Sequence, residues 1–398
     1  MTDRAPGEAL SFPPRKERDI TAAGRRSAGA GNDRDAPGAA RGSRSVERGD
    51  RGLLSACVAV AVAAAASHLV SSTSLVTFVI TLIALGGLAA LIARSIDRLG
   101  DRLGSGATGV VQSALGNLPE LFFSIFALHA GLITVVQATI VGSMLGNMLL
   151  VLGLAFIAGG ARHGTQSFGA EPARNAIALL SLAIAIVIFP TISAHLAVPV
   201  AHHERPFSDT AAIVLLLVFA LAVPSSLGTA EVAPGRSLDK PRTKASWPLG
   251  IALGVLTAAS LGAAFVSDWF VDALSPSLHS LHVSQSFAGL VIVAIAGNAV
   301  ENVVGIQLAL RDRMDYALSV ILQSPIQIAL LLLPVLVLAS YGIGGTPLTL
   351  VLPPLDVLAL GLGTAVTVIV VFDGQSNWLE GAVLVGLYAT IATAFWWG

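Results

Sequence analysis

The sequence has little charge and almost no cysteine. Only 12% of its 398 residues are Asp, Glu, Lys or Arg, whereas 54% are hydrophobic, which is typical of polytopic membrane proteins. The single cysteine, Cys57, excludes a disulfide within the chain and a metal site built from several thiolates. No GxxxxGK[ST] phosphate-binding loop occurs, so we expect no use of nucleotide hydrolysis. The eight histidines lie in loops or at the ends of apolar runs, which disfavours an intramembrane enzyme.

Long apolar runs fill the chain after the first fifty residues. A run of about 20 apolar residues spans the hydrocarbon core of a bilayer, and on this criterion the sequence predicts an all-α polytopic membrane protein with eleven transmembrane helices. We expect these helices near residues 53–70, 75–93, 106–128, 132–159, 175–194, 209–223, 247–267, 284–310, 315–341, 347–372 and 378–397.

The positive charges predict an orientation for these helices. With eleven spans, all of the 23 Lys and Arg residues except Arg205 fall on one side of the membrane. Cytoplasmic loops carry the excess of Lys and Arg in membrane proteins. The N-terminus is therefore expected in the cytoplasm and the C-terminus outside.

Two similar stretches lie 181 residues apart. "ALGNLPE" ends at Glu120 and "AIAGNAVE" ends at Glu301, and the same offset relates Ser143 to Ser324. Glu120 lies on the third predicted helix and Glu301 on the eighth, an offset of five helices, and because five is odd the copies must cross the membrane in opposite directions. The sequence thus predicts two inverted five-helix repeats plus an accessory first helix, an architecture common among secondary transporters.

This repeat divides the chain into five segments. The first is rich in Arg, Gly, Ala, Ser and Asp and is expected to be disordered, and the polar segment between the repeats has the Gly and Pro content of a linker. The predicted segments are a disordered cytoplasmic tail (1–51), the accessory transmembrane helix (52–72), the first inverted repeat (73–224), a cytoplasmic linker (225–246) and the second inverted repeat (247–398).

The two repeated glutamates need a physical explanation. A charged carboxylate at the centre of a bilayer costs about 2.5 to 3.5 kcal/mol on insertion scales, so it is normally paired, solvated or functional. No Lys or Arg lies within the predicted helices near Glu120 or Glu301, which makes a salt bridge an unsuitable explanation. A bound cation, or protons in its absence, would neutralise both carboxylates. Asp356, in the tenth predicted helix, is a weaker candidate for a proton relay.

Small and polar residues accompany both glutamates and the helix that follows each of them. The glycines allow a helix break or a close backbone approach, and the others supply amide and hydroxyl oxygens. These positions are Gly116, Asn117, Ser143 and Asn147 in the first copy and Gly297, Asn298, Ser324 and Gln327 in the second. Carboxylate, amide and hydroxyl oxygens suit Ca²⁺, and the lack of thiolate and imidazole disfavours copper and zinc. We therefore predict a cation site at these ten residues, with Glu120 and Glu301 also carrying protons.

At these motifs the chain resembles the calcium/proton antiporter branch of the calcium/cation antiporter superfamily. The resembling stretches are "GNLPELFFSIFALHAGLITVVQATIVGSMLGNMLLVLG", "GNAVENVVGIQLAL", "ILQSPIQIALLLLPVLVL" and "DGQSNWLEG". The resemblance implies inverted five-helix halves with an extra first helix, and it implies that Glu120 and Glu301 bind the ion. The chain departs from the usual pattern at Leu118 and Pro119, at Asn302 and at two positions beside Ser324.

These observations predict a secondary active transporter that exchanges Ca²⁺ for protons by alternating access. An antiporter of Na⁺, K⁺ or Mn²⁺ that uses the same two glutamates is the first alternative, and a cation channel is the second. We expect no enzymatic activity, no cofactor and no nucleic-acid partner; the partners are inorganic cations, protons and the lipid bilayer. The resemblance and the bias toward Ala, Gly and Arg indicate a bacterial inner membrane.

Overall fold

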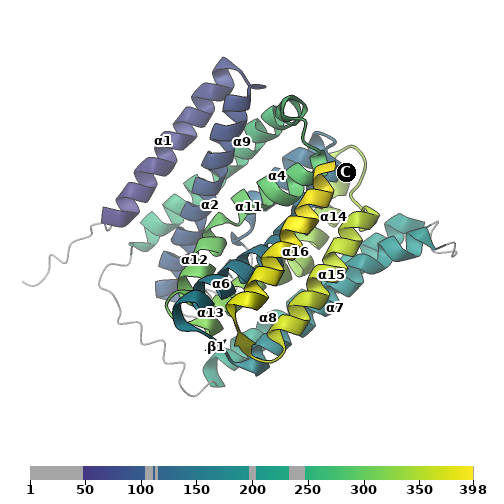
Figure 1. The fold of residues 1–398 in the computed structure, drawn as a ribbon. Helices are drawn as coiled ribbons and strands as arrows, with labels where there is room; N and C mark the ends of the chain where they lie inside the picture. The colour runs from purple at the N-terminus through teal and green to yellow at the C-terminus, as the bar shows by residue number, and fades with distance from the viewer. Residues whose placement is uncertain (1–47, 104–110, 113–114, 197–202, 233–246, 398) are drawn as a thin grey trace, which may run out of the picture. The chain divides into compact units, whose positions relative to one another are not determined.

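The computed structural model describes residues 48–103, 111–112, 115–196, 203–232 and 247–397, which are almost entirely helical (Figure 1). The elements are α1 (Arg48–Val70), α2 (Leu75–Leu103), α4 (Leu118–His129), α5 (Ile133–Leu145), η1 (Gly146–Val151), α6 (Leu152–His163), β1 (Gln166–Ser167), α7 (Ala170–His195), α8 (Glu204–Val232), α9 (Leu249–Leu281), α10 (Gln285–Phe287), η3 (Ala288–Val293), α11 (Ala294–Gly297), α12 (Ala299–Ala309), α13 (Met314–Gln327), η4 (Ile328–Leu332), α14 (Leu333–Ile343), α15 (Pro354–Val371), β2 (Gln375–Ser376) and α16 (Trp378–Trp397). The three η segments are π-helical, and β1 pairs with β2 in antiparallel orientation.

Nine helices in the described part of the chain are long and apolar enough to cross a membrane. The pair Gln285–Gly297 and Glu301–Ala309, bent by 67°, makes ten if it counts as one span. The helix Leu118–His129 is apolar but shorter, and part of the predicted third span, 106–128, lies outside the described residues. The chain is therefore a multi-pass membrane protein, and the count of eleven remains a prediction.

Several helix ends differ from those expected. α1 begins at Arg48, inside the predicted tail 1–51, and α8 runs to Val232, inside the predicted linker 225–246. The rest of that tail and linker, 1–47 and 233–246, lies outside the described residues. α15 begins at Pro354 instead of near residue 347, because glycines with positive φ and two prolines precede it and keep the chain out of helical conformation.

Matching helices begin 181 residues apart in the two halves. α4 begins at Leu118 and α12 at Ala299, and α5 begins at Ile133 and α13 at Met314. Each of α5 and α13 continues into a π-helical segment, η1 after 13 residues and η4 after 14. π-helical turns in α-helices are often found at functional sites, so both halves carry this irregularity at the same place.

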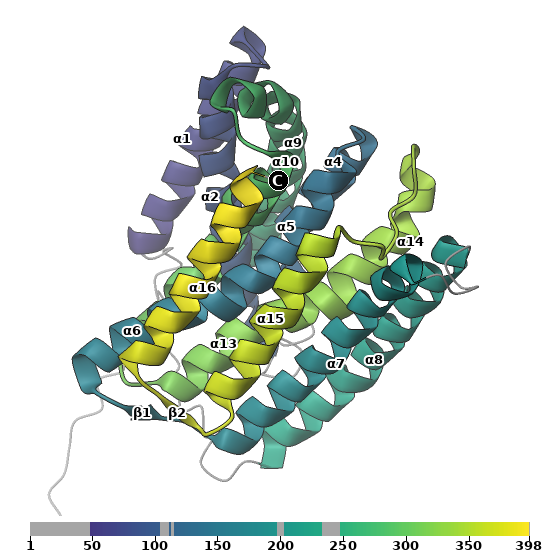
Figure 2. The same cartoon turned by 45° about the vertical axis from the view of Figure 1, so that its right-hand side comes forward.

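The helix from Ile133 to His163 is the most enclosed of the apolar helices in the described part of the chain, with 83% of its apolar window buried. Its last part, α6, lies beside α16 (Figure 2). This long helix crosses η3 at two glycines. A Cβ atom on Gly142 would overlap the backbone of Leu290, and one on Gly289 would lie 2.6 Å from the carbonyl oxygen of Val135. The two halves of the chain therefore meet backbone against backbone at this crossing.

The crossing predicts a strong effect of one added methyl group. Gly142→Ala should destabilise the protein by about 3 kcal/mol, because backbone atoms must shift to admit the Cβ atom. Gly146→Ala is the control in the same continuous helix, since nothing lies within 4 Å of its Cβ position. Thermal unfolding in detergent should show a lower midpoint for Gly142→Ala alone. Equal midpoints would contradict the packing described.

A buried acid joins α1 to α2 and to the start of α9. Asp50 is 3% exposed and accepts from Arg94 Nε at 2.9 Å and from a terminal nitrogen of Arg98 at 2.8 Å. Trp247 Nε1, two residues before α9, donates to the same carboxylate at 3.0 Å. Further along α1, Cys57 Sγ lies 3.2 Å from the carbonyl oxygen of Gly87 in α2. α1 is thus fixed to α2 and to the start of α9 by specific polar contacts as well as by apolar packing.

Candidate cation site

Each glutamate motif begins a new helix. Asn117 caps α4 with φ −96° and ψ 22°, and Asn298 caps α12 with φ −94° and ψ 12°, so the backbone breaks in the same way in both copies. Pro119 lies in the first turn of α4, where backbone N–H groups have no partner within the helix. The proline therefore fits the helix break, although the second copy has no proline at the matching position.

The breaks put both carboxylates in the first turns of helices. Glu120 is the third residue of α4, and Glu301 is the third residue of α12. The N-terminal end of a helix carries a partial positive charge and favours an anion there by about 0.3 to 1 kcal/mol. This helix position offers part of the stabilisation that a Lys or Arg partner would otherwise supply.

Glu120 reaches across to the second copy of the motif. Its side chain is 5% exposed, and a Cβ atom built on Gly297 would lie 2.7 Å from Glu120 Oε1. Glycine at this position therefore makes room for the carboxylate.

Four predicted residues form one hydrogen-bonded cluster. Asn298 Nδ2 donates to Ser143 Oγ at 3.0 Å, and Ser324 Oγ donates to Asn298 Oδ1 at 3.1 Å. Asn147 Nδ2 lies 3.3 Å from Ser324 Oγ and 3.4 Å from Asn298 Oδ1. All four side chains are at most 3% exposed. Residues from both copies therefore meet in one buried polar cluster.

The remaining predicted residues lie around this cluster. Asn117 Nδ2 donates to Gln327 Oε1 at 3.4 Å, so the asparagine of each copy bonds to the other half. Gly116 is different, because its Cβ position is closed by the backbone of Gln112 in its own half. Its Cβ position therefore faces its own half, just before the helix break at Asn117.

Several buried oxygens at the site have no hydrogen-bond partner in the described structure. They are Glu120 Oε2, Glu301 Oε2, Asn147 Oδ1 and Asn302 Oδ1. A buried polar atom without a partner costs about 1 to 3 kcal/mol and is normally satisfied by protein, water or an ion. The described residues contain no cluster of three or more His, Cys, Asp or Glu suited to a metal. A cation here needs amide and hydroxyl oxygens besides the two carboxylates, and the site supplies both.

Three polar side chains close in sequence to the site residues were not among the predicted ones. Asn302 was treated only as a departure from the usual pattern, yet its Oδ1 is one of the partnerless oxygens. Ser124 and Thr139 are 0% and 1% exposed, and their hydroxyl oxygens also have no hydrogen-bond partner in the described structure. Ser124 lies four residues after Glu120 and Thr139 four before Ser143, a spacing that puts each on the helix face of the site residue. This four-residue spacing is the sequence pattern that could have indicated these side chains.

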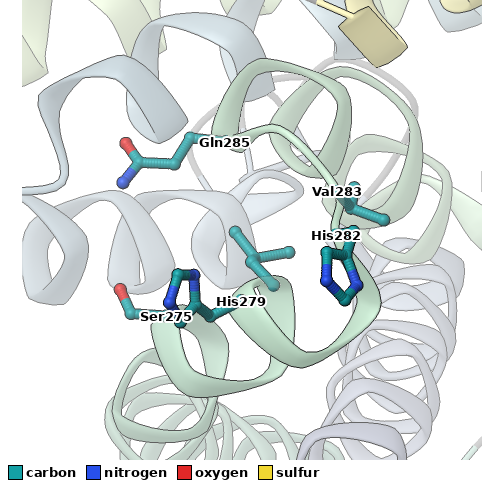
Figure 3. Close-up of a pocket in the computed structure, with 6 residues that line it drawn as sticks. Ser275, His279, His282, Val283 and Gln285 are labelled. Atoms are coloured by element: carbon teal, nitrogen blue, oxygen red, sulfur yellow. The ribbon is translucent and has the colours of Figure 1, made fainter.

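Other features of the described structure lie apart from this cluster. Asp356 is 2% exposed and its Oδ2 has no partner, but no hydrogen bond joins it to the glutamates. A pocket at the end of α9 is lined by residues that include His279, His282 and Gln285. Figure 3 shows the two imidazole rings projecting separately from the helix end and the following loop. Neither feature contains a residue of the predicted site.

The chain matches the family described as sodium/calcium exchanger protein over residues 73–228 and 251–397. The chain belongs to this family. It is 32% identical to a Ca²⁺/H⁺ antiporter of a Synechocystis species, over 83% of this chain and 93% of that protein. It is 31% identical to the Ca²⁺/H⁺ antiporter ChaA of Bacillus subtilis, over 86% of this chain and 97% of that protein. The resemblance seen in the sequence motifs is therefore confirmed.

A solved structure shares the arrangement of helices. The structure of native YfkE superimposes with a TM-score of 0.72 at 30% identity, and the match covers 88% of this chain and 100% of that one. The two segments matched to the sodium/calcium exchanger family each contain one glutamate of the pair, Glu120 in the first and Glu301 in the second. The unmatched residues between them, 229–250, overlap the predicted linker.

Proposed function

We propose that the protein is a Ca²⁺/H⁺ antiporter whose ion site is built around Glu120 and Glu301. The main observation is that each glutamate, in the first turn of a different helix, has a buried oxygen with no hydrogen-bond partner in the described structure. Similarity to proteins named Ca²⁺/H⁺ antiporter, which covers 93% and 97% of their length, supports the same function. Such a protein is a transporter, not an enzyme, and it needs no cofactor.

Charge balance explains how one site can serve both ions. Two carboxylates neutralise one divalent cation, and two protons neutralise the same carboxylates when the cation leaves. Asn117, Asn298, Ser143, Asn147, Ser324 and Gln327 contribute neutral oxygens or position those that bind. Burying two unpaired charges is costly, so the empty site with both carboxylates charged should seldom switch between facing one side of the membrane and the other. Outward movement of Ca²⁺ is then coupled to inward movement of protons.

The proposed architecture is eleven transmembrane helices with two inverted five-helix repeats. The shared offset of 181 residues between helix starts supports it, as does the pairing of each motif asparagine with a residue of the other half. The segments are the tail 1–51, the accessory helix 52–72, the repeats 73–224 and 247–398, and the linker 225–246. The Lys and Arg distribution favours a cytoplasmic N-terminus and an outer C-terminus in a bacterial inner membrane.

Transport in proteoliposomes tests this function. With an imposed pH gradient, the purified protein should move Ca²⁺ against its gradient, and added Ca²⁺ should change the lumenal pH in proportion. Transport of Na⁺, K⁺ or Mn²⁺ in place of Ca²⁺, when these ions are in excess, would favour an antiporter of that cation. Ca²⁺ current without proton movement would favour the channel and contradict the proposal.

A further inference from the structure

A pocket at the ends of α6 and α12 contains two arginines and lies outside the cation site. It has a volume of about 560 Å³ and is lined by Arg162, His163, Gln307, Leu310 and Arg311. Within the described ranges, no carboxylate forms an ion pair with Arg162 or Arg311. The pocket therefore contains two guanidinium groups, and no acidic side chain among the described residues forms an ion pair with either of them.

Hydrogen bonds hold the walls of this pocket together. His163 Nε2 donates to the carbonyl oxygen of Leu310 at 3.0 Å and so joins α6 to the turn after α12. Gln166 in β1 donates to the carbonyl oxygen of Ala309 at 3.1 Å and to Asp312 Oδ1 at 2.7 Å. The acidic residue of this turn is thus engaged by an amide. The two arginines extend from a framework that is formed without a ligand.

Exposed apolar side chains lie along α6 and α12 before the pocket. On α12, Val303 and Val304 are 53% and 39% exposed and lie one turn before Gln307. On α6, Leu154 is 37% exposed and lies eight residues before Arg162, which places both on one helix face. Each helix therefore presents a cation at its end and apolar surface one or two turns deeper. A free phosphate ion would use only the first of these features, whereas a lipid would use both.

We propose that this pocket binds the phosphate headgroup of an anionic lipid, with the acyl chains lying along the exposed apolar faces of α6 and α12. Guanidinium groups bind phosphate through paired, charge-assisted hydrogen bonds. Basic pockets between transmembrane helices at the cytoplasmic surface bind anionic lipid headgroups, and the proposed orientation puts this pocket on that surface. The volume is within the range of sites for small ligands.

A lipid in this position has a consequence for the transporter. α12 carries Glu301 in its first turn, and α6 continues the helix that carries Ser143 and Asn147. A headgroup held by Arg162 of α6 and by Arg311 of the turn after α12 would link the ends of both helices. The lipid therefore stabilises the packing of α6 against α12.

Lipid retention measured by native mass spectrometry tests the site without relying on transport. Detergent-purified protein is incubated with equal amounts of phosphatidylglycerol and phosphatidylcholine. We expect the wild type to retain phosphatidylglycerol preferentially, and the double variant Arg162→Gln/Arg311→Gln to lose this preference by on the order of tenfold, since two charge-assisted contacts are removed. Unchanged preference in the double variant would overturn the proposal.

A charge-matched variant separates a defined site from general surface charge. Arg174 lies 4.5 Å from the ring centre of Phe372, and Arg313 lies 5.9 Å from that of Tyr316, and neither lines the pocket. Arg174→Gln/Arg313→Gln removes the same two charges and should retain the preference. An equal loss in both double variants would assign the effect to surface potential and overturn the site.

Inorganic phosphate distinguishes the two possible sources of the ligand. In the same experiment, excess phosphate should displace no more phosphatidylglycerol than sodium chloride of equal ionic strength does. Displacement specific to phosphate would assign the pocket to the free ion and overturn the lipid proposal. Both outcomes are independent of whether the protein exchanges Ca²⁺ for protons.

Discussion

Replacing Glu120 or Glu301 by Gln should abolish Ca²⁺/H⁺ exchange. Gln keeps the size of the side chain and one oxygen, but it removes a charge and a group that can carry a proton. In a buried site a lost unit charge opposite a divalent cation weakens binding by several kcal/mol, which corresponds to a loss of Ca²⁺ affinity on the order of 100-fold or more. Proton-driven Ca²⁺ uptake into proteoliposomes and Ca²⁺ binding by calorimetry both measure this effect.

The control for this experiment is Glu171→Gln. Glu171 is in the first turn of α7, as the two site glutamates are in theirs, but it is exposed. This variant should transport and bind Ca²⁺ as the wild type does. Wild-type exchange in Glu120→Gln and in Glu301→Gln would disprove the proposed site, provided that gel filtration shows all variants to be folded.

Ca²⁺ binding to the same variants should show whether Ca²⁺ and protons compete for the two carboxylates. Ca²⁺ affinity of the wild type should fall as the pH is lowered, because protons then occupy the carboxylates that the cation needs. In the double variant Glu120→Gln/Glu301→Gln, this dependence on pH should disappear along with high affinity. Ca²⁺ affinity that does not depend on pH in the wild type would argue against a shared site.

The candidate site could be proposed from the sequence because its physics is local and is repeated. A carboxylate in an apolar run is costly wherever it occurs, and Glu120 and Glu301 occur at matching places with the same Gly-Asn before each. The structure brings Asn298 to Ser143 and Asn117 to Gln327. What the sequence pattern lacked was the pairing between halves, since helix periodicity gives the face of a residue but not the helix that it meets.

The helix count was harder to obtain from the sequence for a related reason. A window of apolar residues measures length and hydropathy but does not detect breaks. α12 is bent by 67° from the preceding helix, and α4 begins only at Leu118, inside the span expected at 106–128. Leu118 and Pro119 depart from the usual family pattern, but the backbone angles at Asn117 and Asn298 are nearly the same. The proline simply occupies a helix position where no hydrogen bond is lost.

Asp50 shows where composition misled the interpretation of the sequence. It stands in the arginine-rich segment that was assigned to the tail, 1–51, and nothing in its neighbours distinguishes it from the other acids there. Arg94 and Arg98 were counted only for orientation. Their common face on α2, four residues apart, meets Asp50 across helices. A contact between residues 44 and 48 positions apart has no signature in local periodicity.

This contact leads to the second large effect that we expect. Asp50→Asn should destabilise the protein by about 3 kcal/mol, because breaking a buried ion pair takes a counter-charge from a buried cation. Asp50 and Arg98 have side chains that are 3% and 8% exposed, so water cannot readily replace the lost carboxylate. Asn keeps an oxygen that can accept from Trp247, so the expected loss comes mainly from the charge. Heating in detergent followed by gel filtration measures the fraction that stays folded.

Arg94→Gln provides the matched comparison for the same cluster. The side chain of Arg94 is 41% exposed, so its pair with Asp50 is partly solvated and should contribute less than about 1 kcal/mol. The unfolding midpoint should therefore fall far more in Asp50→Asn than in Arg94→Gln. Asp50 contacts α2 and Trp247, two residues before α9, so its loss should also release α1. Limited proteolysis should then cut Asp50→Asn near residue 70 before the wild type is cut. Equal midpoints and equal cleavage in the two variants would show that the buried charge does not hold the accessory helix.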